Sequence, residues 1–198
     1  MHAQGPISQR FDEALIAAAR RASSFGYSPR RLGHARAAAT LVMQTEADPE
    51  LAVAALLHDA AEGAIDDERV RGIRGAFGDR VARVVAWCSE HGTHPMPPFR
   101  GLDESRVAEL LCATRDQMIV AAADTVAAVR TLIVDLARGP VEAVSSPSTA
   151  DSMSWFMNEV RVALDDRLVG HRLSAEAASA IDALAARLRI ASPFAAAG

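Results

Sequence analysis

The sequence contains no lysine, and all of its basic residues are arginines. Chemistry that needs a lysine amine, such as Schiff-base formation, is therefore excluded. Aromatic residues make up only 5% of the 198 residues, so a hydrophobic core must be built from leucine, valine, isoleucine and alanine. The net charge is −4, and a broad basic surface for duplex nucleic acid is not expected. A small anionic ligand needs only a local group of arginines and remains compatible with this composition.

Long apolar runs and paired cysteines are also missing. No apolar run reaches the roughly 18–20 residues that a membrane-spanning helix needs. The first ten residues lack the apolar core of a signal peptide. Cys88 and Cys112 do not form a CxxC pair and each lies in an apolar stretch, so we expect two buried free thiols. These features predict a cytoplasmic protein that does not interact with membranes.

Apolar residues recur at helical spacing over most of the chain, and no stretch keeps the alternation of a β-strand. Asp48 followed by Pro49 has the form of a helix N-terminus, and the apolar residues after it predict a buried helix. The predicted helices cover 8–23, 31–45, 51–61, 66–76, a segment starting at 79, 103–115, 116–138, 151–168 and 174–190, with loops over 91–101 and 141–150.

This pattern predicts an all-α, single-domain helical bundle over residues 1–198. Its core is expected over about 10–140, with C-terminal helices over about 150–190 packing on that core. The apolar alanine, leucine and valine faces of these helices would also be compatible with a homodimer.

Four side chains of metal-binding type stand in these apolar helices: His34, the adjacent pair His58 and Asp59, and Asp124. A buried carboxylate is costly unless it is paired or binds a metal. Each carboxylate alone could pair with an arginine, and His34 alone could be an ordinary helix residue. Together, the order His, His-Asp and a distant Asp predicts one shared divalent cation, because imidazole and carboxylate suit Mn, Fe, Zn and similar ions.

Residues next to these ligands have candidate roles in catalysis and in substrate binding. Glu62 follows His58 by four residues, which puts both on one helix face, where a carboxylate could transfer protons during catalysis. Arg30 and Arg31 precede His34 by about one turn and are candidates for phosphate binding, since guanidinium groups bind phosphate oxygens in bidentate fashion. Solvated surface arginines remain an equally consistent interpretation of this pair.

The order His34, His58-Asp59 and Asp124 resembles the signature of HD phosphohydrolases. Within that superfamily the sequence is most similar to the alarmone hydrolase domains of the RelA/SpoT type and their small stand-alone relatives, over about residues 10–190. Residues 53–62 resemble the AALLHDxxED helix of those domains, 77–85 resemble FGxxVxxLV, and 122–132 resemble LADKLxNLRxL. Trp155 and Phe156 fit the C-terminal portion.

The resemblance implies a helical bundle around a divalent cation, usually Mn²⁺, with Fe²⁺, Zn²⁺, Co²⁺ and Ni²⁺ as alternatives. It implies that His34, His58, Asp59 and Asp124 are the metal ligands and that Glu62 is a catalytic carboxylate. The implied activity is that of a guanosine 3′,5′-bis(diphosphate) 3′-pyrophosphohydrolase, in which metal-activated water attacks phosphorus and releases pyrophosphate.

The sequence departs from this pattern at several polar positions. Gly63 stands where the family has the second carboxylate of its Glu-Asp pair, and Ala128 stands where it has Asn. Ala121 and Thr125 replace two lysines. The predicted metal ligands are thus intact while the polar residues around the substrate are fewer. This keeps open a degenerate HD domain that binds a nucleotide or a partner without turnover.

Asp66 or Asp67 could replace the missing carboxylate. Glu62 with Asp67 five residues later resembles the HD 5′-nucleotidases that act on deoxyribonucleoside monophosphates, and Asp67 is therefore a second candidate catalytic residue. An HD-type 5′-nucleotidase, or another nucleotide phosphohydrolase, stays open as an alternative. In each case the expected ligand is a small nucleotide.

Overall fold

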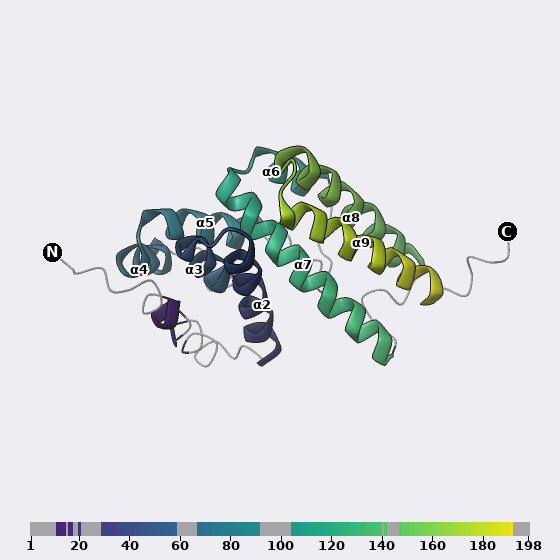
Figure 1. Cartoon of the computed structure of the whole chain (residues 1–198), viewed down its shortest axis with the longest axis horizontal. Coiled ribbons are helices and arrows are strands. Elements are labelled where there is room, and N and C mark those ends of the chain that lie inside the picture. Colours follow the sequence, from purple (N-terminus) through teal and green to yellow (C-terminus); the bar gives the residue numbers. More distant parts are fainter. Residues whose placement is uncertain are drawn as a thin grey trace.

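The computed structural model describes residues 11–14, 16, 17, 20, 29–58, 67–91, 104–139, 141 and 147–191. These residues are almost entirely helical and contain no strand, which confirms the predicted all-α fold (Figure 1). The predicted helix over 8–23 lies mostly outside the described residues. The helices that follow are α2 (Pro29–Thr45), α3 (Pro49–Leu57), α4 (Asp67–Phe77), α5 (Asp79–His91), α6 (Glu104–Cys112), α7 (Arg115–Arg138), α8 (Pro147–Arg167) and α9 (Arg172–Ala191).

Local sequence signals set several of these helix ends. The Asp48 side chain accepts hydrogen bonds from the backbone N–H groups of Glu50 and Leu51, at 3.0 and 3.2 Å, and Pro49 occupies the first turn of α3. A single residue, Gly78, separates α4 from α5. Its φ of +94° is accessible to glycine without strain, and it allows the chain to turn sharply between the two helices.

The longest helix, α7, forms the centre of the molecule. It begins with a capping box between Thr114 and Gln117, and every residue from Met118 to Val129 is buried. In Figure 1, α7 runs through the middle, with α2 to α5 on one side and α6, α8 and α9 on the other. Helices α2 and α3 pack against α7, and α9 lies along it. The residues on α7 therefore contact both halves of the molecule.

Two expectations from the sequence are wrong. Residues 141–150 were expected to be a loop, but α8 begins at Pro147, since proline suits the first position of a helix. Cys112 was expected to be buried; Cys88 is a buried free thiol, whereas Cys112 is exposed. Helix α6 has only nine residues and packs one face towards α8, which leaves Leu111 and Cys112 at its surface.

Among the described residues, no helix is both long enough and apolar enough to cross a membrane.

Candidate metal centre

Three helices bring His34, His58 and Asp124 together. His34 lies on α2, His58 is the C-cap residue of α3, and Asp124 lies in the middle of α7. One imidazole nitrogen of each histidine and one carboxylate oxygen of Asp124 all lie within 4.8 Å of one another. His58 and Asp124 are buried, and the side chain of His34 is 10% exposed. The site is thus a small polar cluster inside an apolar core.

Small residues and backbone contacts set the positions of these side chains. Ala38 and Ala39 are fully buried on the face of α2, where short side chains permit the close approach of neighbouring helices. The Nδ1 of His58 lies 2.6 Å from the carbonyl oxygen of Ala55 in the preceding turn. Ser89 on α5 has its hydroxyl 3.0 Å from the carbonyl oxygen of His58. The contact with Ala55 therefore orients the His58 ring, while Ser89 of α5 holds the backbone of the same residue.

The arrangement of donors and acceptors calls for a positive charge at the centre of the cluster. A carbonyl oxygen can only accept, so the Nδ1 of His58 carries the proton in its bond to Ala55. In the neutral ring, the other nitrogen, Nε2, then presents a lone pair to Oδ1 of Asp124 at 3.2 Å. The Nε2 of His34 lies 2.6 Å from the same oxygen. A cation bound between Nε2 of His58 and Oδ1 of Asp124 would compensate the electron pairs that face each other there.

The donor set fits a divalent cation. Ligand atoms that share one cation at about 2.1 Å lie roughly 3 Å from each other, and both contacts to Asp124 are near that value. Two imidazoles and a carboxylate suit first-row transition metals. The bond from Nδ1 of His58 to a backbone carbonyl also has the form that fixes a metal-binding tautomer. His34, His58 and Asp124 could therefore hold a divalent metal.

Three predicted residues cannot be placed in this cluster. Asp59 follows His58 directly, and both Asp59 and Glu62 lie outside the described residues. Asp67 is the first residue of α4, but the structure does not describe the position of its side chain. Their roles remain predictions from the sequence.

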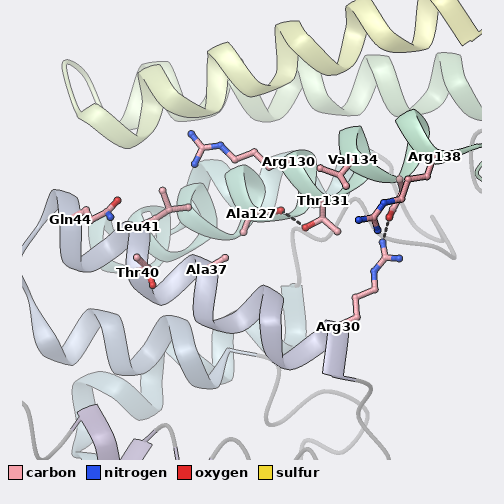
Figure 2. A pocket seen from close by; sticks show the side chains of 11 residues that line it. Arg30, Ala37, Thr40, Leu41, Gln44, Ala127, Arg130, Thr131, Val134 and Arg138 are labelled. Atoms are coloured by element: carbon pink, nitrogen blue, oxygen red, sulfur yellow. Dashed lines mark hydrogen bonds and ion pairs between the residues drawn. The ribbon is translucent and has the colours of Figure 1, made fainter.

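The two predicted phosphate-binding arginines differ in their surroundings. Arg30 lines a groove of about 690 Å³ between α2 and α7, and its guanidinium donates to the carboxylate of Asp135 (Figure 2). Arg31 is partly buried in the first turn of α2 and does not line this groove. The groove approaches the metal centre along α7, because its lining residue Ala127 follows Asp124 by three residues, which is less than one helical turn.

Several groove residues on α7 were not predicted from the sequence. Thr131, Asp135 and Arg138 line the groove together with Ala127. Their spacing of four and three residues places them on one face of α7, so extending the helical periodicity beyond Asp124 would have found them. Arg130, which also lines the groove, forms an ion pair with Glu176 of α9 at 2.9 Å.

The residues that replace family polar groups add no polar atom to the site. Thr125 is fully buried, and its hydroxyl donates to the carbonyl of Ala121 in its own helix at 2.8 Å. Ala128, at the family's Asn position, is fully buried. At these two described positions, the chain therefore lacks the polar contacts that the pattern it resembles would offer.

An all-α domain in which histidines and an aspartate from three helices meet is an arrangement suited to metal-dependent hydrolases. The sequence model of the family described as "HD domain" matches residues 13–140, and the chain belongs to this family. HD domains are typically metal-dependent phosphohydrolases, and the His34, His58 and Asp124 cluster fits such a metal site. Helices α8 and α9 lie beyond the matched region. No curated protein matches the sequence significantly.

Proposed function

We propose that this protein is a metal-dependent hydrolase of nucleotides, with a guanosine nucleotide that carries a 3′-pyrophosphate as its favoured substrate. The observation that carries the proposal is the meeting of His34, His58 and Asp124 in a chain of the HD domain family. The resemblance of residues 53–62, 77–85 and 122–132 to alarmone hydrolases supports the choice of guanosine 3′,5′-bis(diphosphate).

The side chains of the site have separate roles in this proposal. His34, His58 and Asp124, together with Asp59, would hold the cation, with Mn²⁺ preferred. A divalent cation held there would polarise a phosphoryl oxygen and make a water molecule more acidic. The hydrogen bond from His58 to Ala55 keeps the ring in a ligating orientation. Burial of the cluster removes competing water and strengthens its electrostatic interactions.

The proposed reaction needs one proton transfer. The oxygen of water forms a bond to phosphorus, and the bond between that phosphorus and the 3′ oxygen of the ribose breaks. The proton lost by water must reach the leaving 3′ oxygen, which then becomes a hydroxyl group. Glu62 is the proposed carrier, because it follows His58 by only four residues in the sequence and a carboxylate can accept and donate a proton. Asp67 is the proposed alternative, and it would favour a 5′-nucleotidase.

A second candidate function is nucleotide binding without turnover. The hydroxyl of Thr125 is bonded within its own helix, and Ala128 is a buried alanine. Neither residue offers a substrate the polar contact that the related pattern provides. This function predicts that a nucleotide raises the melting temperature while no phosphate or pyrophosphate is released.

The experiment is a product-release assay with Mn²⁺ on 3′-pyrophosphorylated guanosine nucleotides, nucleoside monophosphates and nucleoside triphosphates. Pyrophosphate release from the first group supports the favoured substrate, and phosphate release from monophosphates supports the nucleotidase. The Asp124→Asn variant should lose at least about a hundredfold in rate, because a ligand to the catalytic cation is removed. Asp182→Asn is the matched control, since Asp182 is exposed on α9, away from the cluster.

Metal content supplies a second readout. After incubation with Mn²⁺ and dialysis, the wild-type protein and Asp182→Asn should retain metal, and Asp124→Asn should retain much less. Absence of turnover on every nucleotide, with metal bound near stoichiometry, would contradict the proposed hydrolase and favour the binding function.

A further inference from the structure

The groove between α2 and α7 has the size and lining of a small-molecule site. Its volume of about 690 Å³ lies within the range of roughly 300–1,000 Å³ that is usual for such sites. Ala37 and Leu41 from α2 and Ala127 and Val134 from α7 give it apolar walls (Figure 2). A flat organic group, such as a nucleobase, could bury apolar surface against these side chains.

Charged side chains gather at the end of the groove away from the metal centre. The guanidinium of Arg30 donates to the carboxylate of Asp135, with side-chain exposures of 51% and 19%. Arg138 lines the same end, is exposed, and has no ion-pair partner among the residues that the structure describes. Figure 2 shows Arg30 reaching from α2 towards the part of α7 that carries Arg138. Two guanidinium groups and one carboxylate thus lie at this end of the groove, and only Arg30 is paired with the carboxylate.

This balance of charges favours an anion with more than one negative charge. Two guanidiniums and one carboxylate leave a net positive charge, and guanidinium groups bind phosphate oxygens in bidentate fashion. A weakly charged group would compete poorly with the carboxylate of Asp135 for Arg30. A diphosphate could bind Arg138 directly and draw Arg30 away from Asp135.

The distance between this end and the metal centre matters for the substrate. Asp135 lies three helical turns beyond Asp124 on α7, roughly 16 Å along the helix axis. A ligand with its reacting phosphoryl group at His34 and Asp124 would therefore reach Arg30 and Arg138 only with a second, separate anionic group. A nucleoside phosphorylated at both ends of its ribose has this form.

We infer that the charged end of the groove, between Arg30 and Arg138, binds the non-reacting diphosphate of the proposed nucleotide substrate. Asp135 acts as an internal counter-ion, which occupies Arg30 in the absence of ligand and lowers the affinity for weaker anions. This inference rests on the proposed function for the identity of the reacting group, but the anion site itself can be tested without metal.

The test is isothermal titration calorimetry in EDTA with guanosine 5′-diphosphate and with guanosine. Wild-type protein should bind the diphosphate more tightly than guanosine. Asp135→Asn should bind the diphosphate about threefold to tenfold more tightly, because the competing carboxylate is gone. Arg138→Gln should bind it about tenfold more weakly. Guanosine affinity should not change in either variant.

The matched control is Arg187→Gln, an exposed arginine on α9 that does not line the groove. Melting temperatures close to wild type would show that each variant is folded, and Arg30→Gln provides a second variant that should weaken diphosphate binding. A purely structural ion pair predicts no gain of affinity in Asp135→Asn. An unchanged or weaker affinity in that variant, or an Arg138→Gln variant that binds like Arg187→Gln, would overturn the inference.

The two proposals fail separately. Binding of the diphosphate with the predicted variant effects, but with no turnover in Mn²⁺, would refute the proposed hydrolase and leave the anion site in place. Turnover that depends on Asp124, with diphosphate binding unaffected by Asp135→Asn and Arg138→Gln, would refute the anion site alone.

Discussion

One guanidinium, that of Arg80 at the start of α5, joins the N-terminal regions of α3, α5 and α7. It forms two hydrogen bonds with Asp116, at 2.7 and 3.0 Å, and one with Asp48, at 2.8 Å. The hydrogen bond from Arg80 holds the pKa of Asp116 below its usual value of 3.8. The bonds to Asp116 and Asp48 likewise raise the pKa of Arg80. Arg80 therefore links the starts of α3, α5 and α7 through charged hydrogen bonds.

The lowered pKa of Asp116 makes stability depend on pH. A carboxylate with a depressed pKa contributes stability that is present above its unfolded pKa and is lost as the pH falls through its folded pKa. Both side chains are about one-third exposed, so solvent screening limits the contribution to about 1 kcal/mol. We expect Asp116→Asn to lower the free energy of unfolding by this amount at pH 7, and to show a smaller decrease between about pH 5 and pH 3 than wild type.

Urea unfolding at a series of pH values measures this effect. The exposed Asp182→Asn variant serves as the control and should follow the wild-type curve. Parallel curves for Asp116→Asn and wild type across the acid range would show that the Arg80 pair does not contribute in solution.

At the scale of a single helix, the start of α3 combines two functions in Asp48. Its carboxylate caps the helix through Glu50 and Leu51, and it also accepts a hydrogen bond from Arg80. Asn caps helices about as well as Asp, whereas Ala does not. We expect Asp48→Asn to destabilise the protein by less than about 1 kcal/mol and Asp48→Ala to cost about 1 kcal/mol more. Chemical denaturation of the two variants separates the cap from the ion pair. Equal losses would mean that the cap is unimportant.

The packing of α2 depends on its alanines. Ala38 and Ala39 are fully buried, whereas Ala37 is exposed to the groove. Ala38→Leu should reduce the free energy of unfolding by about 1–3 kcal/mol, because extra methyl groups in a packed core force neighbouring side chains and backbone to shift. The same change at Ala37 should alter stability by less than about 0.5 kcal/mol. Urea denaturation compares the two, and similar losses at both positions would contradict close packing of this face.

Helix ends with local signals were predictable from the sequence. Asp48 and Pro49 predicted the start of α3, and the predicted helix over 66–76 with a new one from 79 placed a break where Gly78 separates α4 from α5; the structure confirms both. The start of α8 at Pro147 was missed because small polar residues surround it and no apolar stripe marks the first turn. Exposure of Cys112 was also missed, since it depends on which face of a short helix meets α8.

The residue types of the metal centre were predictable, but the groove was not. Histidines and aspartates are unusual in apolar helices, so His34, His58 and Asp124 stood out in the sequence. The pair between Arg30 and Asp135 joins residues 105 positions apart and depends on how α2 meets α7. Helical periodicity gives the face of each helix but not the angle between helices. Contacts between residues far apart in the sequence can therefore be identified only once the packing of the helices is known.

At the scale of the whole molecule, Glu46 at the end of α2 connects three helices. Its carboxylate accepts from Arg115 at the start of α7 at 3.2 Å, and pairs with His171 at the start of α9. The backbone N–H of Leu173 donates to the other ring nitrogen of His171 at 3.1 Å. This junction ties α9, which lies beyond the family match, to the helices that carry the metal centre.

Metal binding at the candidate centre should increase the stability of the folded protein. Its candidate ligands come from three helices separated by long stretches of sequence, so the site exists only in the folded chain. A ligand that binds only the native state stabilises it by about 2.7 kcal/mol at a hundred times its Kd. For a chain of this length, that corresponds to an increase in Tm of about 5–10 °C.

Thermal unfolding with increasing Mn²⁺, after removal of metal with EDTA, measures this increase. His34→Ala removes one imidazole from the cluster and should abolish most of the increase, whereas the exposed Asp182→Asn variant should retain it. An equal increase in His34→Ala would mean that Mn²⁺ binds elsewhere on the chain. Because the readout is stability, this result separates metal binding from turnover. A full increase in Tm together with an inactive protein would assign the chain to the HD domains that bind their ligands without hydrolysis.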